Sequence, residues 1–432
     1  MGEIKNRISK DYRNVITLMS GTTISQVIPI IATVFIARLY TSHQFGEIEL
    51  FLKISTFLVV LSTLRYELAI PLPKLDKHAF HIFNFSFRWN LILMLIGQTL
   101  LFLAYFFVNP YLGKYQFSYF YLLLPVYVFL MAFNSQAENW LLRKEKFRLL
   151  TYSKVSNAFA NNVFKIGIGL ISIGSVGLIL GNIIGYLIGG LVFLPETIKA
   201  FSSHTSEKGK AARWVSAKAF RDFPFVNAPH AVADALKEIF VVVLFIKFFN
   251  KETVGYYYFA LKIIRIPISL IGIAFAQVFY NNAADLISKK KSIRKYVMKN
   301  ARDLFLISIV PVLVLMFFGE ELFSFAFGSN WAFAGKLAAI NAPVLLVLFV
   351  SSPLSRIPML LNQQRWFFVI SMFNNVSILT TIFIGSRWFH MSFEDLWIAL
   401  TVLQFVVLSS VIVWYYAIVS KYEANLQMEA KD

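Results

Sequence analysis

Eight basic side chains lie inside stretches of the sequence that are apolar enough to cross a lipid bilayer. They are Lys53, Arg65, Arg88, Lys165, Lys237, Lys262, Arg265 and Arg356. A charge at membrane depth costs about 2.5–3.5 kcal/mol on insertion scales, so such residues usually face a partner or a water-filled cavity. Lysine binds phosphate as a point charge, and arginine binds it through two parallel hydrogen bonds. These residues therefore favour a cationic cavity that would fit an anionic diphosphate headgroup.

Few acidic side chains are available at similar depth to neutralise these cations. One predicted helix carries Asp234 and Glu238, and Glu67 lies near the inner end of another. Lys237 is adjacent to Glu238, so we expect it to pair with either acid of its own helix only poorly. The plainer expectation for Glu238 is a salt bridge to a lysine or arginine on a facing helix. The sharper hypothesis is that Asp234 or Glu238 couples transport to a proton or a sodium ion.

Several predicted helices carry polar side chains at intervals of three and four residues, which places them on one face of a helix. The stripes are Ser153, Asn157, Asn161 and Lys165; Asn227, His230, Asp234 and Glu238; Tyr258, Lys262, Arg265 and Ser269; and His81, Asn84 and Arg88. Asparagine and serine often hydrogen-bond between helices in membranes, and for the asparagines alone we favour that role. For the lysines and arginines we favour a cavity, because the acids are too few to pair with them.

The composition is that of an integral membrane protein. The 432 residues are 58% hydrophobic and 15% charged, which is more apolar and less charged than soluble domains. A net charge of +18 would suggest nucleic-acid binding in a soluble chain. Here most of the basic residues fall in loops, where they report topology and contact with anionic lipid headgroups. We therefore expect anionic membrane lipids as partners, and no nucleic acid.

Twelve segments are long enough to span a bilayer, for which about 20 residues are needed. They cover approximately 15–37, 47–70, 81–108, 117–141, 151–173, 176–198, 223–249, 254–280, 301–318, 336–361, 366–387 and 394–418. If the N-terminus is cytoplasmic, most of the 41 lysines and arginines fall on the cytoplasmic side, as the positive-inside rule requires. We therefore predict a multi-pass protein with both termini in the cytoplasm.

A long polar connector divides the chain into two halves of six predicted helices each. We expect an N-terminal lobe over 1–198, a cytoplasmic linker over 199–222 and a C-terminal lobe over 223–432. Six spans per half give both halves the same orientation, so their repeat is parallel, with its axis along the membrane normal. Such a repeat places a substrate site between the halves.

A short match at an offset of 209 residues supports this repeat. The segment FGEIELFLKI (45–54) aligns with VGYYYFALKI (254–263), so that Gly46 meets Gly255 and Lys53 meets Lys262. Glycine at a loop-to-helix junction is common, but the alignment of two rare intramembrane lysines is not. We expect Lys53 and Lys262 to occupy equivalent positions.

Motifs of enzyme chemistry are missing from the sequence. It contains no GxxxxGK[ST], HExxH or GxSxG pattern, and its six histidines form no plausible metal cluster. Cysteine is absent, which excludes disulfides, thiolate metal sites and cysteine nucleophiles. We expect a protein that is not an enzyme and has no cofactor.

Several segments resemble one known family. Residues 221–280, which open with RDFPFVNAPH and contain LKIIRIPISLIG, resemble the seventh and eighth helices of bacterial polysaccharide-unit flippases. These flippases belong to the multidrug/oligosaccharidyl-lipid/polysaccharide exporter superfamily. The further segments are IARLYTSHQFGEIELF (36–51), LRYELAIPLPK (64–74), NWLLRKEKFRLLTYSKV (139–155) and SSPLSRIPMLLNQQR (351–365).

The resemblance implies an all-α fold of twelve transmembrane helices in two six-helix bundles around a central cationic cavity. It implies translocation of a polyprenyl-diphosphate-linked oligosaccharide from the cytoplasmic to the periplasmic leaflet of the bacterial inner membrane by alternating access. The product would serve O-antigen, capsule or exopolysaccharide assembly, with glycan polymerase machinery as a partner. Because helices 1, 2, 7 and 8 line the cavities of the family, the resemblance nominates Lys53, Lys262 and Arg265 in particular.

Three other functions compete with this interpretation. A flippase for a lipid-linked peptidoglycan precursor differs only in its cargo. A cation-coupled drug antiporter of the same superfamily needs acids for cationic substrates, and the basic bias argues against it. A membrane glycosyltransferase or polymerase would need a large periplasmic loop or a cluster of catalytic carboxylates, whereas the predicted outer loops are short.

Overall fold

The computed structural model of the chain describes residues 2–115, 117–204 and 218–429. The described residues are almost entirely helical, and none of them forms a strand. Residues 205–217, which make up the middle of the predicted linker 199–222, lie outside this description. Contacts divide the chain into unit 1, Met1–Tyr40 with Glu47–Ile239, and unit 2, Thr41–Gly46 with Phe240–Asp432. The division passes through two helices, α2 and α8, and the predicted six-helix lobes stay a prediction.

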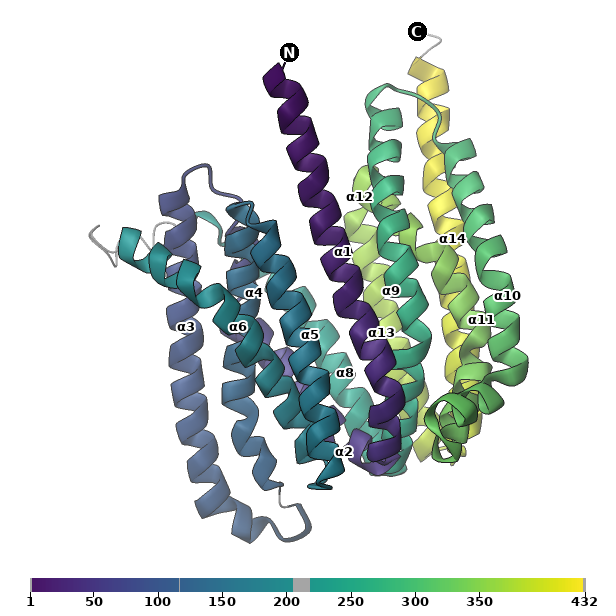
Figure 1. The fold of residues 1–432 in the computed structure, drawn as a ribbon. Helices are drawn as coiled ribbons and strands as arrows, with labels where there is room; N and C mark the ends of the chain where they lie inside the picture. The colour runs from purple at the N-terminus through teal and green to yellow at the C-terminus, as the bar shows by residue number, and fades with distance from the viewer. Residues whose placement is uncertain (1, 116, 205–217, 430–432) are drawn as a thin grey trace. The chain divides into compact units, whose positions relative to one another are not determined.

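Unit 1 is built from long helices, most of which run antiparallel to the helix before them in the chain (Figure 1). Its elements are α1 (Gly2–Leu39), most of α2 (Ser42–Thr63), η1 (Tyr66–Ala69), α3 (Asp76–Leu103), η2 (Ala104–Val108), η3 (Asn109–Tyr115), η4 (Tyr119–Leu123), α4 (Leu124–Arg143), α5 (Phe147–Leu170), α6 (Val176–His204), η5 (Phe223–Asn227) and the first half of α8 (Ala228–Phe248). An aromatic core around Phe80, Phe83 and Trp140 packs α3 against α4, and Phe201 of α6 closes it.

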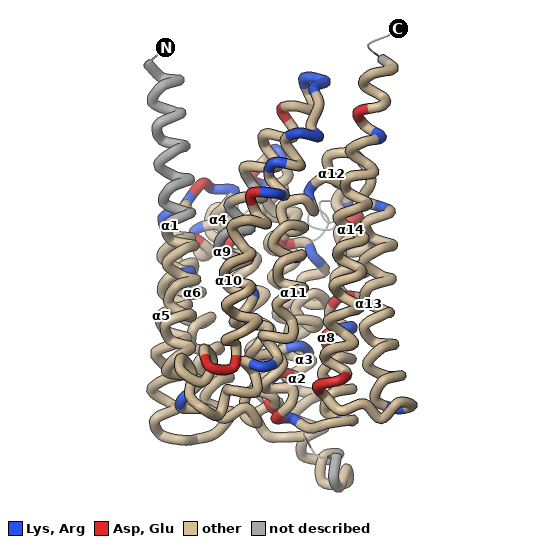
Figure 2. Tube along the Cα trace, turned by 90° about the vertical axis from the view of Figure 1, so that its right-hand side faces the viewer, with Lys and Arg blue, Asp and Glu red and all other residues tan. Residues whose placement is uncertain are grey.

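Unit 2 contains the remaining helices and the first turn of α2. Its elements are the second half of α8, α9 (Lys251–Ser288), α10 (Arg294–Phe327), η6 (Ser329–Trp331), α11 (Ala332–Leu354), α12 (Ile357–Leu360), α13 (Gln364–Arg387) and α14 (Phe393–Glu429). A core of Phe279, Leu354 and Tyr415 packs α9, α11 and α14 together. Figure 2 shows that the tip where α9 meets α10 is densely basic, whereas the middles of α10 and α13 are almost free of charge.

Twelve helices in the described part of the chain have at least 20 residues, and each overlaps one predicted segment. Eight of them are long and apolar enough to cross a membrane, namely α1, α3, α4, α6, α10, α11, α13 and α14. The other four, α2, α5, α8 and α9, carry Lys53, Lys165, Lys237 and Lys262. The protein is therefore a multi-pass helical membrane protein. The arrangement of twelve spans in two bundles stays a prediction.

The starts of α2 and α9 are capped at equivalent positions of the predicted repeat. Thr41 and Gln44 form a reciprocal capping box, in which each side chain accepts from the backbone N–H of the other, at 3.3 and 2.9 Å. Asn250, which lies 209 residues after Thr41, caps α9 by accepting from the N–H of Thr253 at 2.8 Å. The two helices therefore begin at the offset that the sequence indicates.

A pair of glycines brings these two helix starts into backbone contact within unit 2. A β-carbon on Gly46 would lie 1.6 Å from the carbonyl oxygen of Lys251, and one on Gly255 would lie 1.8 Å from that of Ser42. The two contacts are exchanged by the 209-residue offset, because Ser42 corresponds to Lys251 and Gly46 to Gly255. Reciprocal contacts of this kind are the mark of a two-fold axis. The two helix starts are thus equivalent across the 209-residue offset, and the two-fold repeat of the halves stays a prediction.

We predict that Gly46→Ala or Gly255→Ala destabilises the protein, because a methyl group cannot enter a backbone contact this close. Overpacking typically costs about 1–3 kcal/mol. The melting temperature of the purified protein in detergent measures the effect. The matched control is Gly167→Ala, also in a helix, where a β-carbon meets nothing within 4 Å. A melting temperature of the Gly46 variant equal to that of the control contradicts the prediction.

Candidate substrate-binding site

Four charged side chains from α2 and α8 form one cluster inside unit 1. The ammonium of Lys53 lies 3.8 Å from Glu49 on its own helix and 3.4 Å from Glu238 on α8. Lys237 lies 2.7 Å from the other oxygen of Glu238. The side chains are between 15% and 33% exposed, so they are partly shielded from solvent. Two lysines and two glutamates give the cluster no net charge.

This cluster confirms one expectation, corrects another and adds a partner that the sequence analysis did not name. Glu238 does form a salt bridge to a lysine on a facing helix. The expectation that Lys237 pairs poorly with the acids of its own helix is wrong, because its long side chain folds back onto the adjacent Glu238. Sequence reasoning also missed Glu49 as a partner. The signal was present, since Glu49 and Lys53 are four residues apart and therefore neighbours on a helix.

A second titratable pair lies one turn earlier on α8. His230 Nδ1 is 3.5 Å from Asp234 Oδ2, and both side chains are nearly half exposed. Histidine is the residue whose ordinary charge change falls near physiological pH. Of the two acids proposed for ion coupling, Glu238 is thus held by two lysines and Asp234 lies beside a histidine.

Lys165 lies at the contact between α5 and α6. Its ammonium donates to Asn182 Oδ1 at 2.8 Å, and the amide of Asn161 donates to the same oxygen at 2.9 Å. Gly181 and Gly185 of α6 bring its backbone against the side chains of Lys165 and Asn161. The predicted role of the asparagines in tying helices together is confirmed at Asn161, and Lys165 shares it.

Arg65 lies beyond the end of α2, whereas the sequence predicted a continuous helix through residue 70. Leu64 and Arg65 both have positive φ, 48° and 61°, which turns the chain out of the helix. Arg65 Nη1 then lies 3.5 Å from Glu67 Oε1. Burial raises the pKa of the Glu67 carboxyl, against the opposing effects of its hydrogen bond with Thr63 and of the Arg65 charge. This pair shapes the turn between α2 and α3.

Arg88 and Arg356 are both exposed. Arg88 on α3 donates from Nε to Asn84 Oδ1 at 2.7 Å, within its own helix. Arg356 lies between the end of α11 at Leu354 and the start of α12 at Ile357. The sequence predicted it inside a helix over 336–361, and the short break after Leu354 corrects that position.

Lys262 and Arg265 lie on the exposed face of α9 in unit 2. The neighbouring positions Leu261 and Ile264 are buried, whereas both basic residues are exposed. They are three residues apart and therefore on one helix face. Lys53 and Lys262 belong to different units, and their facing one another stays a prediction.

Comparison with known proteins places this chain in a family. A family model described as polysaccharide biosynthesis protein matches residues 35–335, more than two thirds of the sequence. The chain belongs to the polysaccharide biosynthesis protein family. The resemblance noted from the sequence segments is thereby confirmed. No curated protein matches the chain in sequence.

Solved structures with the same fold include transporters of the MOP superfamily. An inward-facing multidrug resistance MATE family transporter aligns with a TM-score of 0.68 at 12% identity, over 94% of this chain and 99% of its own. The lipid II flippase MurJ, in an inward closed conformation, aligns with a TM-score of 0.67 at 14% identity, over 96% and 92%. A MOP superfamily transporter from Pyrococcus furiosus, described as having a binding pocket of reverse polarity, gives 0.58 at 12% identity, over 95% and 96%.

We predict that Lys53 and Glu238 are energetically coupled, because each is the other's partner between α2 and α8. A double-mutant cycle with Lys53→Met, Glu238→Gln and the combined variant should give a coupling of about 1 kcal/mol in stability, within the range for residues in contact. The pair Lys336 and Glu394 is closer at 2.7 Å but more exposed, at 44% and 40%, and should couple less. If the effects of the Lys53 and Glu238 substitutions on the free energy of unfolding are additive, the contact between them contributes nothing to stability.

Proposed function

We propose that this protein is a flippase that moves a polyprenyl-diphosphate-linked oligosaccharide from the cytoplasmic to the periplasmic leaflet of the bacterial inner membrane. The family assignment supplies the link to polysaccharide biosynthesis, and the fold is that of MOP superfamily transporters. The cycle makes and breaks no covalent bond. Both termini lie in the cytoplasm, as the distribution of basic loops indicates.

The observation that carries the proposal is the position of Lys262 and Arg265. They lie together on an exposed face of α9. A charged face of this kind is costly against lipid and stable against water or an anion. Because ammonium and guanidinium groups suit phosphate, the chemistry fits the diphosphate of a lipid-linked glycan.

Two related functions differ in cargo. The lipid II flippase has the same fold, so a lipid-linked peptidoglycan precursor is the alternative cargo of the same chemistry. The chain also has the fold of a multidrug transporter. Transport of cationic drugs would require an anionic site. The face of Lys262 and Arg265 has the wrong sign for such cargo.

We predict that Arg265→Ala and Lys262→Ala abolish translocation while the protein level in the membrane stays near wild type. Both side chains are exposed, so their removal opens no cavity in the core. Translocation is measured in proteoliposomes as exposure of a polyprenyl-diphosphate-linked oligosaccharide to an enzyme added outside. Lys289→Ala, which removes an exposed lysine just after the end of α9, is the matched control. Equal loss of protein and transport in the Arg265 and Lys262 variants would indicate structural roles instead.

Cargo is distinguished in the same assay. We expect the protein to transport the polyprenyl-linked oligosaccharide and to export no cationic dye. We also expect this oligosaccharide lipid to compete against a lipid-linked peptidoglycan precursor for transport. Dye efflux without glycan-lipid transport would overturn the proposal.

We predict that Asp234, with His230, couples transport to a proton gradient, and that Glu238 does not. The reason is that Glu238 is already neutralised by Lys53 and Lys237, whereas Asp234 lies next to a histidine. Asp234→Asn and His230→Gln should lose the dependence of transport on an imposed proton gradient, and Glu238→Gln should retain it. Unchanged gradient dependence in both the Asp234 and the His230 variants rules the coupling role out.

A further inference from the structure

A small basic pocket lies in unit 1 where α4 and α6 end. It is lined by Trp140 and Lys144 from α4 and its cap, by Lys146 from the turn to α5, and by Glu196, Lys199, Ala200 and Ser203 from α6. Its volume is about 230 Å³. A water molecule occupies about 30 Å³ in the liquid, so the pocket is several times larger than a hydration site.

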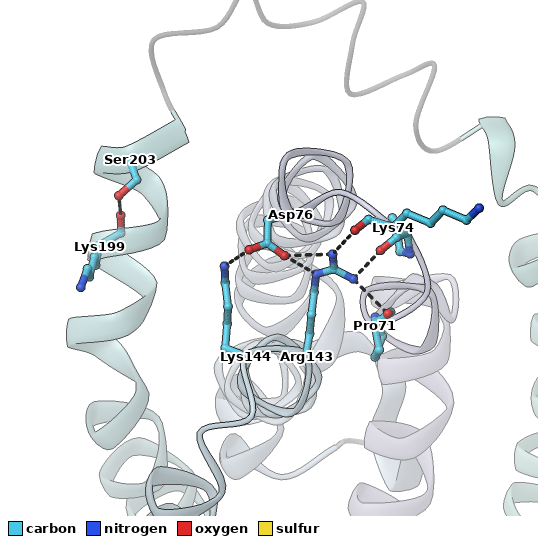
Figure 3. A network of polar contacts seen from close by, with 8 residues as sticks. Pro71, Lys74, Asp76, Arg143, Lys144, Lys199 and Ser203 are labelled. Carbon is cyan, nitrogen blue, oxygen red and sulfur yellow. Dashed lines mark hydrogen bonds and ion pairs between the residues drawn. The ribbon is translucent and has the colours of Figure 1, made fainter. Parts of the chain in front are cut away.

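The sequence RKEK over 143–146 builds one side of this pocket. Glu145 has a φ of 54°, and this left-handed residue turns the chain between α4 and α5. Arg143 donates to the carbonyl oxygen of Pro71 at 3.0 Å and to Asp76 at 2.9 Å, which fixes the loop before α3 (Figure 3). Lys144 pairs with the second oxygen of Asp76. Its ammonium also lies 5.0 Å from the ring centre of Trp140.

The other side of the pocket is the last turns of α6. Lys146 forms an ion pair with Glu196. The hydroxyl of Ser203 donates to the carbonyl oxygen of Lys199 at 2.8 Å, which holds this turn in place (Figure 3). Lys199 itself is exposed, and no acid within the described ranges lies in ion-pair distance of its ammonium. The charged residues that line the pocket are three lysines and one acid, namely Lys144, Lys146, Lys199 and Glu196, so bases exceed acids in the lining.

We propose that this pocket binds the phosphate of an anionic phospholipid, with Lys199 as its principal ligand and Lys144 and Lys146 beside it. Two of the candidate membrane spans end here, at Arg143 and at Ser203, so the pocket lies at the level where the apolar part of each helix stops. Headgroup phosphates occupy that level of a bilayer. Basic pockets between the ends of transmembrane helices bind anionic headgroups. The site is separate from the translocation of the glycan lipid and does not rest on the proposed function.

The charge balance argues for a lipid with net negative charge. Phosphatidylglycerol brings one negative charge to a pocket whose lining has an excess of positive charge. Phosphatidylcholine brings its own cation, which Lys199 would repel. An anionic headgroup is therefore favoured over a zwitterionic one of similar size.

Binding is tested with the purified full-length protein, stripped of lipid in detergent and titrated with phosphatidylglycerol under native mass spectrometry. Lys199→Gln should weaken retention of one phosphatidylglycerol about fivefold, which corresponds to about 1 kcal/mol for one basic residue near a membrane surface. Lys199→Arg keeps the charge and should keep the affinity. Phosphatidylcholine should bind the wild type no better than it binds the Lys199→Gln variant.

The matched control is Lys74→Gln, which removes an exposed lysine from the loop before α3 that does not line the pocket. It should leave retention of phosphatidylglycerol unchanged. Equal weakening by Lys74→Gln and Lys199→Gln would overturn the proposal in favour of diffuse attraction to a basic surface. Inorganic phosphate, added alone, should not compete at concentrations comparable with the lipid. Competition at such concentrations would make this a site for free phosphate and overturn the lipid assignment.

Discussion

An ammonium group in an apolar helix must find an oxygen atom, and this requirement links the long helices of unit 1. Lys165 meets it with the side-chain oxygen of Asn182, which ties α5 to α6. Lys53 meets it with Glu49 and Glu238, which ties α2 to α8. An unpaired lysine at either position would cost more free energy than most single packing contacts contribute to stability. The polar stripes of the sequence are therefore positions at which helices are joined as well as candidate contacts for cargo.

The sequence predicts the helices well, because long apolar segments have few alternatives in a membrane. It predicts the turns around the basic residues less well. The segment 47–70 contains no glycine or proline, so nothing in its composition marks the left-handed turn at Leu64 and Arg65 that ends α2. Arg65 was consequently placed on a helix that it does not belong to. Partners of flexible side chains were also missed, because the pairing of Lys237 with Glu238 depends on side-chain conformation, which spacing does not encode.

The glycine contact at the start of α2 and α9 gives a structural reason for the glycine that recurs at the 209-residue offset. Lys53 lies seven residues after Gly46, and Lys262 lies seven residues after Gly255. At about 1.5 Å of rise per residue, each lysine is roughly 10 Å along its own helix from the contact. Only glycine, which has no β-carbon, permits the carbonyl oxygen of the other helix to approach its α-carbon this closely. Each helix thus carries a basic residue at the same distance along its own axis from the glycine contact.

The neutral state of the cluster has a consequence for any anionic cargo. Lys53 is shared between Glu49 and Glu238, and an ammonium group has only three hydrogens to donate. A diphosphate that binds Lys53 would therefore compete with these glutamates for the same ammonium group. Because Glu238 is the partner supplied by α8, weakening of that contact would loosen the tie between α2 and α8. Binding of cargo and movement of these helices would then be thermodynamically coupled. A cation without acidic partners would bind the same diphosphate more tightly, but it would not transmit binding to a second helix.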